Sequence, residues 1–215
     1  MSSRPSGSFF SSGGVSGFLH IPPAPANRGL VLTHGAGANC QTPLLVAIAE
    51  AFESTGFTVL RCDLPFRQKR KTGPPHPSQA SEDRQGLKAA LAAIREIVSG
   101  PIVLGGHSYG GRQASILASE EPSVSDALLF LSYPLHAPGK PDRLRTAHFP
   151  QLQTPSLFVH GTKDPFGTTE ELQTALRLIP GANELSIVEG AGHDLKRGRF
   201  DIVTVVLNPL QLLMK

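Results

Sequence analysis

Short apolar runs recur along the chain, and between them lie longer stretches in which apolar residues return at helical spacing. Short apolar runs that end in glycine or polar residues are typical of strands buried on both faces. Strands that alternate with helices pair in parallel through right-handed crossovers. The pattern therefore predicts an α/β fold with a mostly parallel, doubly wound sheet and helices on both faces. The runs that predict strands span residues 18–21, 30–33, 57–61, 102–106, 127–132, 156–160 and 184–188.

Helices are expected in the stretches between these runs. The stretch over residues 79–98 places its apolar side chains on one face. The stretch over residues 43–55 begins with proline and ends before glycine, which are typical helix boundaries. A third helix is expected over residues 109–119, and a fourth over residues 168–179, which open with a Thr-x-x-Glu capping box.

Length and composition predict a single folded domain. The chain has 215 residues, of which 40% are hydrophobic and 17% charged. A chain of this size buries one sizeable core. Residues 1–17 are rich in serine and glycine. We therefore expect a flexible tail over residues 1–17 and one domain over residues 18–215.

Charge and cysteine content argue against several classes of protein. The net charge of +3 is too small for nucleic-acid binding without a concentrated basic patch. No stretch approaches the ~18 consecutive apolar residues of a membrane span. Cys40 and Cys62 lack metal-ligand spacing, and two cysteines do not suggest a disulfide framework. We predict a cytoplasmic protein without metal, nucleic-acid partner or membrane span. The sequence leaves open whether the chain forms a homodimer.

The candidate chemistry centres on Ser108. The strand predicted over residues 102–106 ends in Gly106-His107-Ser108-Tyr109-Gly110, which matches the G-x-S-x-G nucleophile elbow. In this motif a sharp turn between a strand and a helix exposes a serine hydroxyl, and glycines two residues to either side prevent a collision. A glycine-rich turn with an incidental serine is the alternative interpretation.

Two later strands end in the other groups that a nucleophilic serine requires. Asp164 follows the strand over residues 156–160, and His193 follows the strand over residues 184–188. A base must take the serine proton, and an acid must orient the base. Because the carboxyl ends of parallel strands share one edge of the sheet, we expect Ser108, Asp164 and His193 to form a catalytic triad.

Two backbone N–H groups are expected to form an oxyanion hole. One donor follows the nucleophile and belongs to Tyr109. The other should lie in the small-residue loop after the strand over residues 30–33. We favour Ala36 as the second donor, with Gly37 as the neighbouring alternative. The alternative interpretation of this loop is an ordinary tight turn without a catalytic function.

Four motifs together resemble the small, uncapped α/β-hydrolases of the dienelactone hydrolase-like group. They are His-Gly-Ala-Gly-Ala at residues 34–38, Gly-His-Ser-Tyr-Gly-Gly-Arg at 106–112, Gly-Thr-Lys-Asp-Pro-Phe-Gly at 161–167 and Gly-Ala-Gly-His at 190–193. The resemblance covers roughly residues 18–197. It implies a single-domain α/β-hydrolase fold and a serine triad, but it does not identify a substrate.

The chain departs from this group in two places. Ser108 stands where true dienelactone hydrolases carry cysteine. The C-terminal segment is interrupted by Asn208-Pro209, so the last helix is expected to be short, broken or unusually apolar. Larger hydrolases insert a lid at the connection over residues 133–154, which here is too short and too rich in proline for a cap domain.

A basic stretch, Arg67-Gln68-Lys69-Arg70-Lys71, follows another predicted strand. A solvated loop is one interpretation. The other is an electropositive rim that attracts anionic esters, formed together with Arg112, Arg143 and Arg145. His136 is a further candidate for lining the pocket. Gly37, Arg67, Arg112 and His136 are therefore the predicted substrate contacts.

These observations predict a serine hydrolase that acts on small carboxylic esters, thioesters or lactones through an acyl-enzyme. Such a triad requires no metal or cofactor. Two alternatives remain. One is a non-catalytic binding or scaffold protein with the same fold, and the other is a cofactor-free perhydrolase with the same triad.

Overall fold

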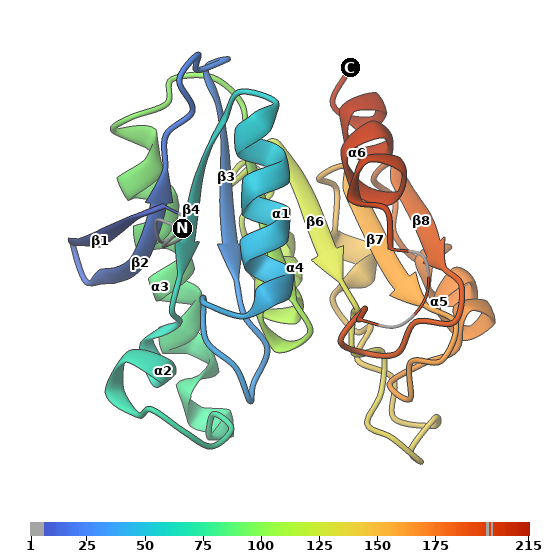
Figure 1. The fold of residues 1–215 in the computed structure, drawn as a ribbon. Coiled ribbons are helices and arrows are strands. Elements are labelled where there is room, and N and C mark those ends of the chain that lie inside the picture. The colour runs from blue at the N-terminus through green and yellow to red at the C-terminus, as the bar shows by residue number, and fades with distance from the viewer. Residues whose placement is uncertain (1–6, 197, 199) are drawn as a thin grey trace.

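The computed structural model describes residues 7–196, 198 and 200–215. Eight strands form one sheet in the order β1-β2-β4-β3-β5-β6-β7-β8 (Figure 1). Strands β3 to β8 run parallel to one another. At one edge of the sheet β2 pairs antiparallel with β4, and β1 pairs antiparallel with β2. The strands are β1 (Ser8–Ser12), β2 (Val15–His20), β3 (Arg28–Thr33), β4 (Phe57–Cys62), β5 (Ile102–His107), β6 (Ala127–Leu131), β7 (Ser156–Gly161) and β8 (Asn183–Val188).

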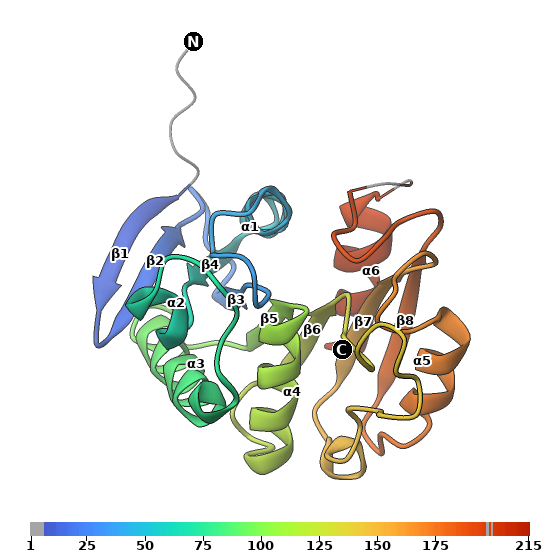
Figure 2. The same ribbon diagram turned by 90° about the horizontal axis from the view of Figure 1, so that it is seen from below.

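Helices cover both faces of the sheet, which confirms the doubly wound prediction (Figure 2). One face packs against α1 (Pro43–Ser54) and α6 (Asn208–Leu213). The other packs against α3 (Ala80–Arg95), α4 (Tyr109–Glu120) and α5 (Thr169–Leu176). Successive side chains of a strand point to opposite faces, so a strand between two helical layers must be apolar throughout. This explains why the central strands appear in the sequence as continuous apolar runs.

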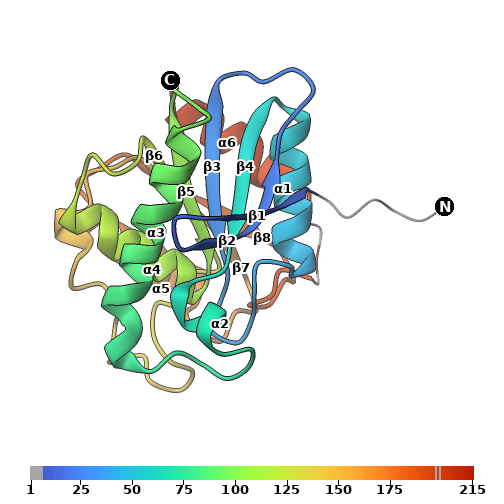
Figure 3. The same ribbon diagram turned by 90° about the vertical axis from the view of Figure 1, so that its left-hand side faces the viewer.

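The N-terminal edge differs from the expected flexible tail. Residues 8–12 and 15–20 form strands β1 and β2, whose hairpin lies at the outer edge of the sheet (Figure 3). Most of β1 is exposed on both faces. Its register therefore depends on backbone pairing with β2, and it lacks the apolar alternation that predicts a strand. The first part of the expected tail, residues 1–6, lies outside the described residues.

Helix boundaries largely follow the capping signals in the sequence. The capping box predicted at Thr168 is present, because its hydroxyl accepts from the Glu171 N–H and Glu171 accepts from the Thr168 N–H. The interruption expected at Asn208-Pro209 takes the form of a π-helical segment, η3 (Val203–Leu207), that runs directly into α6. Proline has no N–H to donate, and Pro209 stands in the first turn of α6, the part of a helix that tolerates proline best.

The connection from β6 to β7 contains only a 3₁₀ turn, η2 (Phe149–Gln151), so the chain has no cap domain in the part that the structure describes. None of the helices described is both long and apolar enough to cross a bilayer. The carboxyl edge of the sheet is therefore covered by loops and by the short helix α2 (Pro65–Lys69), which follows β4. Ser108, Asp164 and His193 follow β5, β7 and β8 at this edge.

Candidate active site

Ser108 lies in a strained turn between β5 and α4. Its backbone angles are φ 51° and ψ −115°, a region that residues with a side chain rarely adopt. A Cβ on Gly106 would lie 2.6 Å from the Gly111 nitrogen, and one on Gly110 would lie 2.6 Å from the His34 oxygen. Glycine is thus required at both positions by close backbone contacts.

The three predicted triad side chains form one hydrogen-bonded chain. The His193 Nε2 lies 2.8 Å from the Ser108 Oγ, and the His193 Nδ1 lies 2.8 Å from the Asp164 Oδ2. The Asp164 carboxylate is fully buried and its Oδ1 accepts a hydrogen bond from the Phe166 N–H at 2.9 Å. With Nδ1 protonated toward Asp164, Nε2 is free to accept the serine proton.

Two further histidines and an aromatic ring hold this chain in place. The His107 Nε2 donates to the His193 carbonyl at 2.8 Å, and burial lowers the pKa of His107 to about 4, so it is neutral near pH 7. His160 is fully buried next to Asp164 and its Nε2 donates to the Gly167 carbonyl at 2.8 Å. The Phe166 ring packs on the His193 ring, with 4.2 Å between their centroids. His107 thus holds the backbone of His193, and Phe166 packs against its imidazole ring.

The predicted oxyanion donors lie beside Ser108. Ala36 and Tyr109 line the same pocket as Ser108. Within the described part of the chain, neither backbone N–H donates to another group. Both donors are therefore available for a ligand. Gly37, the alternative donor and predicted substrate contact, is exposed and is not among the residues that line this pocket.

Arg67 has a different role from the predicted substrate contact. It is 5% exposed, and its guanidinium donates to four backbone carbonyls. Nε donates to Ala38 at 2.6 Å, Nη2 to Ala36 at 2.9 Å and Gly73 at 3.0 Å, and Nη1 to Arg70 at 3.0 Å. Four of its five N–H donors bind backbone carbonyls of the chain itself, so Arg67 fixes the loop that carries Ala36, and it is not among the described residues that line the pocket beside Ser108.

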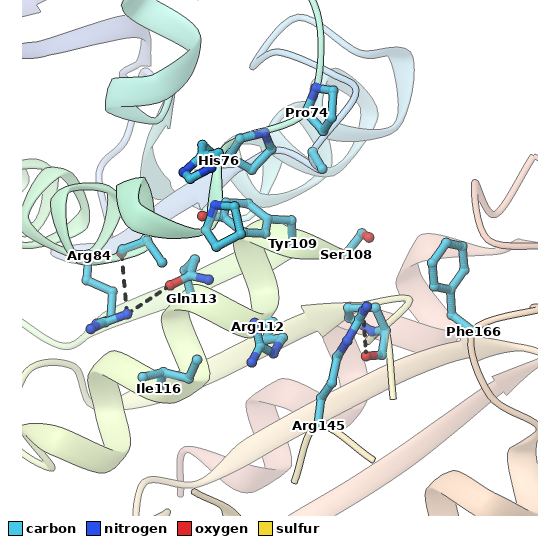
Figure 4. A pocket seen from close by; sticks show the side chains of 15 residues that line it. Pro74, His76, Arg84, Ser108, Tyr109, Arg112, Gln113, Ile116, Arg145 and Phe166 are labelled. Carbon is cyan, nitrogen blue, oxygen red and sulfur yellow. Dashed lines mark hydrogen bonds between the residues drawn. The ribbon is translucent and has the colours of Figure 1, made fainter. Parts of the chain in front are cut away.

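A pocket of about 570 Å³ opens beside Ser108 (Figure 4). The α4 helix forms its floor, the connection from β4 to α3 forms one wall, and residues of the β6–β7 connection form the other. The described residues that line it are Ala36, Pro74, Pro75, His76, Pro77, Ala80, Arg84, Ser108, Tyr109, Arg112, Gln113, Ile116, Pro134, Arg145 and Phe166.

Of the four predicted substrate contacts, Arg112 alone lines this pocket. His136 is 6% exposed and its Nδ1 donates to the Ala137 carbonyl at 2.8 Å. Its Nε2 lies 3.3 Å from Glu171, in the first turn of α5. His136 thus links a loop to the start of that helix. This contact is set by tertiary packing, which the sequence pattern does not reveal.

With this geometry established, comparison with known proteins identifies the fold family. A sequence profile described as "Alpha/beta hydrolase domain" matches residues 26–205. The chain belongs to the alpha/beta hydrolase family. The crystal structure of a dienelactone hydrolase from Anabaena variabilis superposes with a TM-score of 0.70 and 22% identity, over 97% of this chain and 94% of that chain. This likeness shows the same fold.

Two curated relatives align with most of this alpha/beta hydrolase chain. A "putative phosphoribosyl transferase" of Mycobacterium tuberculosis is 27% identical over 182 residues, which are 83% of this chain and 39% of that protein. The chain thus spans less than half of that relative's length. A "putative protein-lysine deacylase" of Pongo abelii is 24% identical over 169 residues, 78% of this chain and 75% of that protein.

The structure also shows supporting residues of this hydrolase domain that the sequence analysis missed. Asp83 is fully buried; its Oδ2 accepts from the Tyr109 hydroxyl at 2.7 Å and its Oδ1 from the Phe66 N–H at 3.1 Å. Burial raises the pKa of Asp83. This carboxylate ties α3 to the residue after Ser108. A signal was present, because Asp83 lies four residues before Leu87 and so on the apolar face of the expected helix.

Proposed function

We propose that the protein is a serine hydrolase that cleaves small carboxylic esters, thioesters or lactones through an acyl-enzyme. The observation that carries this proposal is the hydrogen-bonded chain from Ser108 through His193 to Asp164, next to an open pocket. A nucleophile, a base and a group that orients the base are the parts that acyl transfer requires.

In the first half of the reaction, the Ser108 Oγ attacks the substrate carbonyl while its proton passes to the His193 Nε2. Asp164 holds the imidazole in the required tautomer and stabilises its positive charge. The C–O or C–S bond to the leaving group then breaks, and the His193 proton moves to the departing atom. The product is an ester between Ser108 and the acyl group.

Water completes the cycle by the same steps. His193 takes a proton from water as the water oxygen attacks the acyl-enzyme, and it returns that proton to the Ser108 oxygen as the acid leaves. The Ala36 and Tyr109 N–H groups are assigned to the oxyanion of both tetrahedral intermediates. Loss of one such donor typically lowers kcat on the order of 10²–10³-fold.

The decisive experiment treats the purified protein with a fluorophosphonate probe and measures its intact mass. The native protein should gain one adduct, and Ser108→Ala should gain none. Ser132→Ala is the matched control, because Ser132 also follows a strand of this sheet with a positive φ of 52°, and this variant should label like the native protein. Labelling of Ser108→Ala at the native rate would overturn the assignment.

A substrate panel then separates the chemical classes. Short and medium p-nitrophenyl esters, acyl thioesters, lactones and an acetyl-lysine peptide would be compared by kcat/KM, the last because one relative bears the name of a protein-lysine deacylase. Cleavage of the esters that is lost in Ser108→Ala supports the proposal. A folded native protein that neither labels nor cleaves any of them supports the non-catalytic scaffold. Peroxide-dependent halogenation without ester cleavage supports the perhydrolase.

A further inference from the structure

Two arginines face the pocket beside the nucleophile. Arg112 lies on α4 one helical turn after Ser108, so its Cα is about 6 Å further along the helix axis. Arg145 comes from the β6–β7 connection and lines the opposite wall (Figure 4). Both side chains are only partly exposed. They lie where a substrate bound at Ser108 would extend along α4.

Neither guanidinium has a carboxylate partner among the described residues. Arg112 makes no side-chain hydrogen bond there, and its Nε is buried without an acceptor. Arg145 makes one long contact, from Nη1 to the Pro134 carbonyl at 3.4 Å. By contrast Arg84, in the same pocket, pairs with Glu120 at 3.2 Å.

The two charges also repel each other. Burial lowers the pKa of Arg145, and the charge of Arg112 lowers it further. The nearby His148 adds no positive charge near pH 7, because burial and Arg112 lower its pKa to about 4. Cations that are close together and partly desolvated are costly unless an anion joins them. The rest of the pocket surface is largely apolar, and Tyr109, Ile116 and Pro134 are among the residues that line it.

We propose that the pocket binds substrates that carry a carboxylate in addition to the scissile bond, and that Arg112 and Arg145 together bind this carboxylate. The fitting class is a monoester or thioester of a small dicarboxylic acid, with a short apolar spacer between its two ends. Guanidinium groups match the planar carboxylate and bind it through paired hydrogen bonds. This inference rests on the proposed hydrolase function and specifies its substrate.

The test compares matched pairs of substrates. The p-nitrophenyl monoesters of glutaric and adipic acid would be assayed beside p-nitrophenyl valerate and hexanoate, which have the same chain lengths without the charge. We expect kcat/KM for the charged esters to exceed that of the neutral ones by about 10–100-fold at low salt. The preference should fall as the ionic strength rises.

Variants assign the preference to the two side chains. Arg112→Gln and Arg145→Gln should each lower kcat/KM for the charged esters by about tenfold, and leave the neutral esters within about twofold. The matched control is Arg143→Gln, which removes an exposed charge two residues from Arg145 and outside the pocket, and it should change neither class. Arg112→Lys keeps the charge but loses the paired geometry, so it should retain part of the preference.

The outcomes separate this inference from the proposed function. Equal kcat/KM for charged and neutral esters, both lost in Ser108→Ala, would overturn the carboxylate site and leave the hydrolase standing. If no ester is cleaved, the carboxylate site is tested by measuring glutarate binding by calorimetry. Binding that is lost in Arg112→Gln and kept in Arg143→Gln would support the carboxylate site without the hydrolase, and no binding would overturn it.

Discussion

Arg67 and Arg112 lie in two regions next to the same site, and their surroundings are opposite. Around Arg67, in the connection from β4 to α3, backbone carbonyls accept from four of its five N–H donors. Around Arg112, on α4, no described group accepts from the guanidinium. The first arginine is part of the protein's internal hydrogen bonding, and the second is open to a ligand.

The difference shows what distinguishes a structural arginine from a binding one. Burial alone does not distinguish the two arginines, because both side chains are largely removed from water. The number of guanidinium N–H groups that have an acceptor within the protein does distinguish them. A buried donor without an acceptor costs free energy, which a ligand can recover by accepting that hydrogen bond. Arg67 should therefore matter for stability, and Arg112 for selectivity.

The largest expected effect is on the free energy of unfolding of Arg67→Gln. Without the guanidinium, buried carbonyls on both sides of the loop lose their donors, and we expect a loss of about 3 kcal/mol or more. Urea denaturation measures this. Activity toward every ester should fall together, because Ala36 loses its support. Lys71→Gln, at an exposed position in the same connection, is the control. A loss below about 0.5 kcal/mol would remove the distinction between the two arginines.

A smaller effect is expected for Arg112→Gln. This change removes a charge that has no partner, so the free energy of unfolding should stay within about 1 kcal/mol of the native value or rise. The same urea titration measures it, beside Arg67→Gln. If Arg112→Gln were as destabilising as Arg67→Gln, Arg112 would have a structural partner and the carboxylate site would lose its main support.

The smallest effect concerns the pKa of His148, which burial and Arg112 lower to about 4. In Arg112→Gln only burial remains, so the pKa should rise, and an NMR titration of the His148 ring measures it. An unchanged pKa would show that the charge of Arg112 is neutralised within the protein.

The same shift gives a stability prediction with a definite sign. Unfolded His148 binds a proton near its ordinary pKa of about 6.5, whereas the folded state excludes that proton down to about pH 4. The unfolded state therefore binds more protons between these values, and stability falls as the pH drops through this range. In Arg112→Gln the folded-state pKa of His148 should lie closer to its unfolded value, so the pH range over which the two states differ in protonation narrows. The loss of stability between pH 7 and pH 4 should therefore be smaller than in the native protein, and thermal unfolding over this pH range measures it.

The sequence predicted the parts of the molecule that follow local rules. The central strands are buried on both faces, so their positions were visible as apolar runs, and the glycines around Ser108 follow from close backbone contacts. The expected proximity of Ser108, Asp164 and His193 followed from one topological rule about parallel strands. The rule predicts only that they share one edge, and the hydrogen bonds among them are seen in the folded chain.

What the sequence missed depends on partners that are distant along the chain. Strand β1 is an exposed edge held by backbone pairing, so its side chains carry no strand pattern. Arg67 and Arg112 are the same residue type, and only the folded chain shows that carbonyls surround one of them. The link from Asp83 to Tyr109 spans 26 positions, beyond the reach of a helical periodicity.

The positive φ of Ser108 has a consequence for selection. The backbone at this position suits glycine, and relief of the strain with Ser108→Gly should stabilise the fold by about 1 kcal/mol. A library of substitutions at position 108 sorted for resistance to heat should therefore enrich glycine, and the same library sorted for ester cleavage should return serine. The fold and the chemistry place opposite demands on one residue, and the outcome of evolution at this position depends on which of the two is under selection.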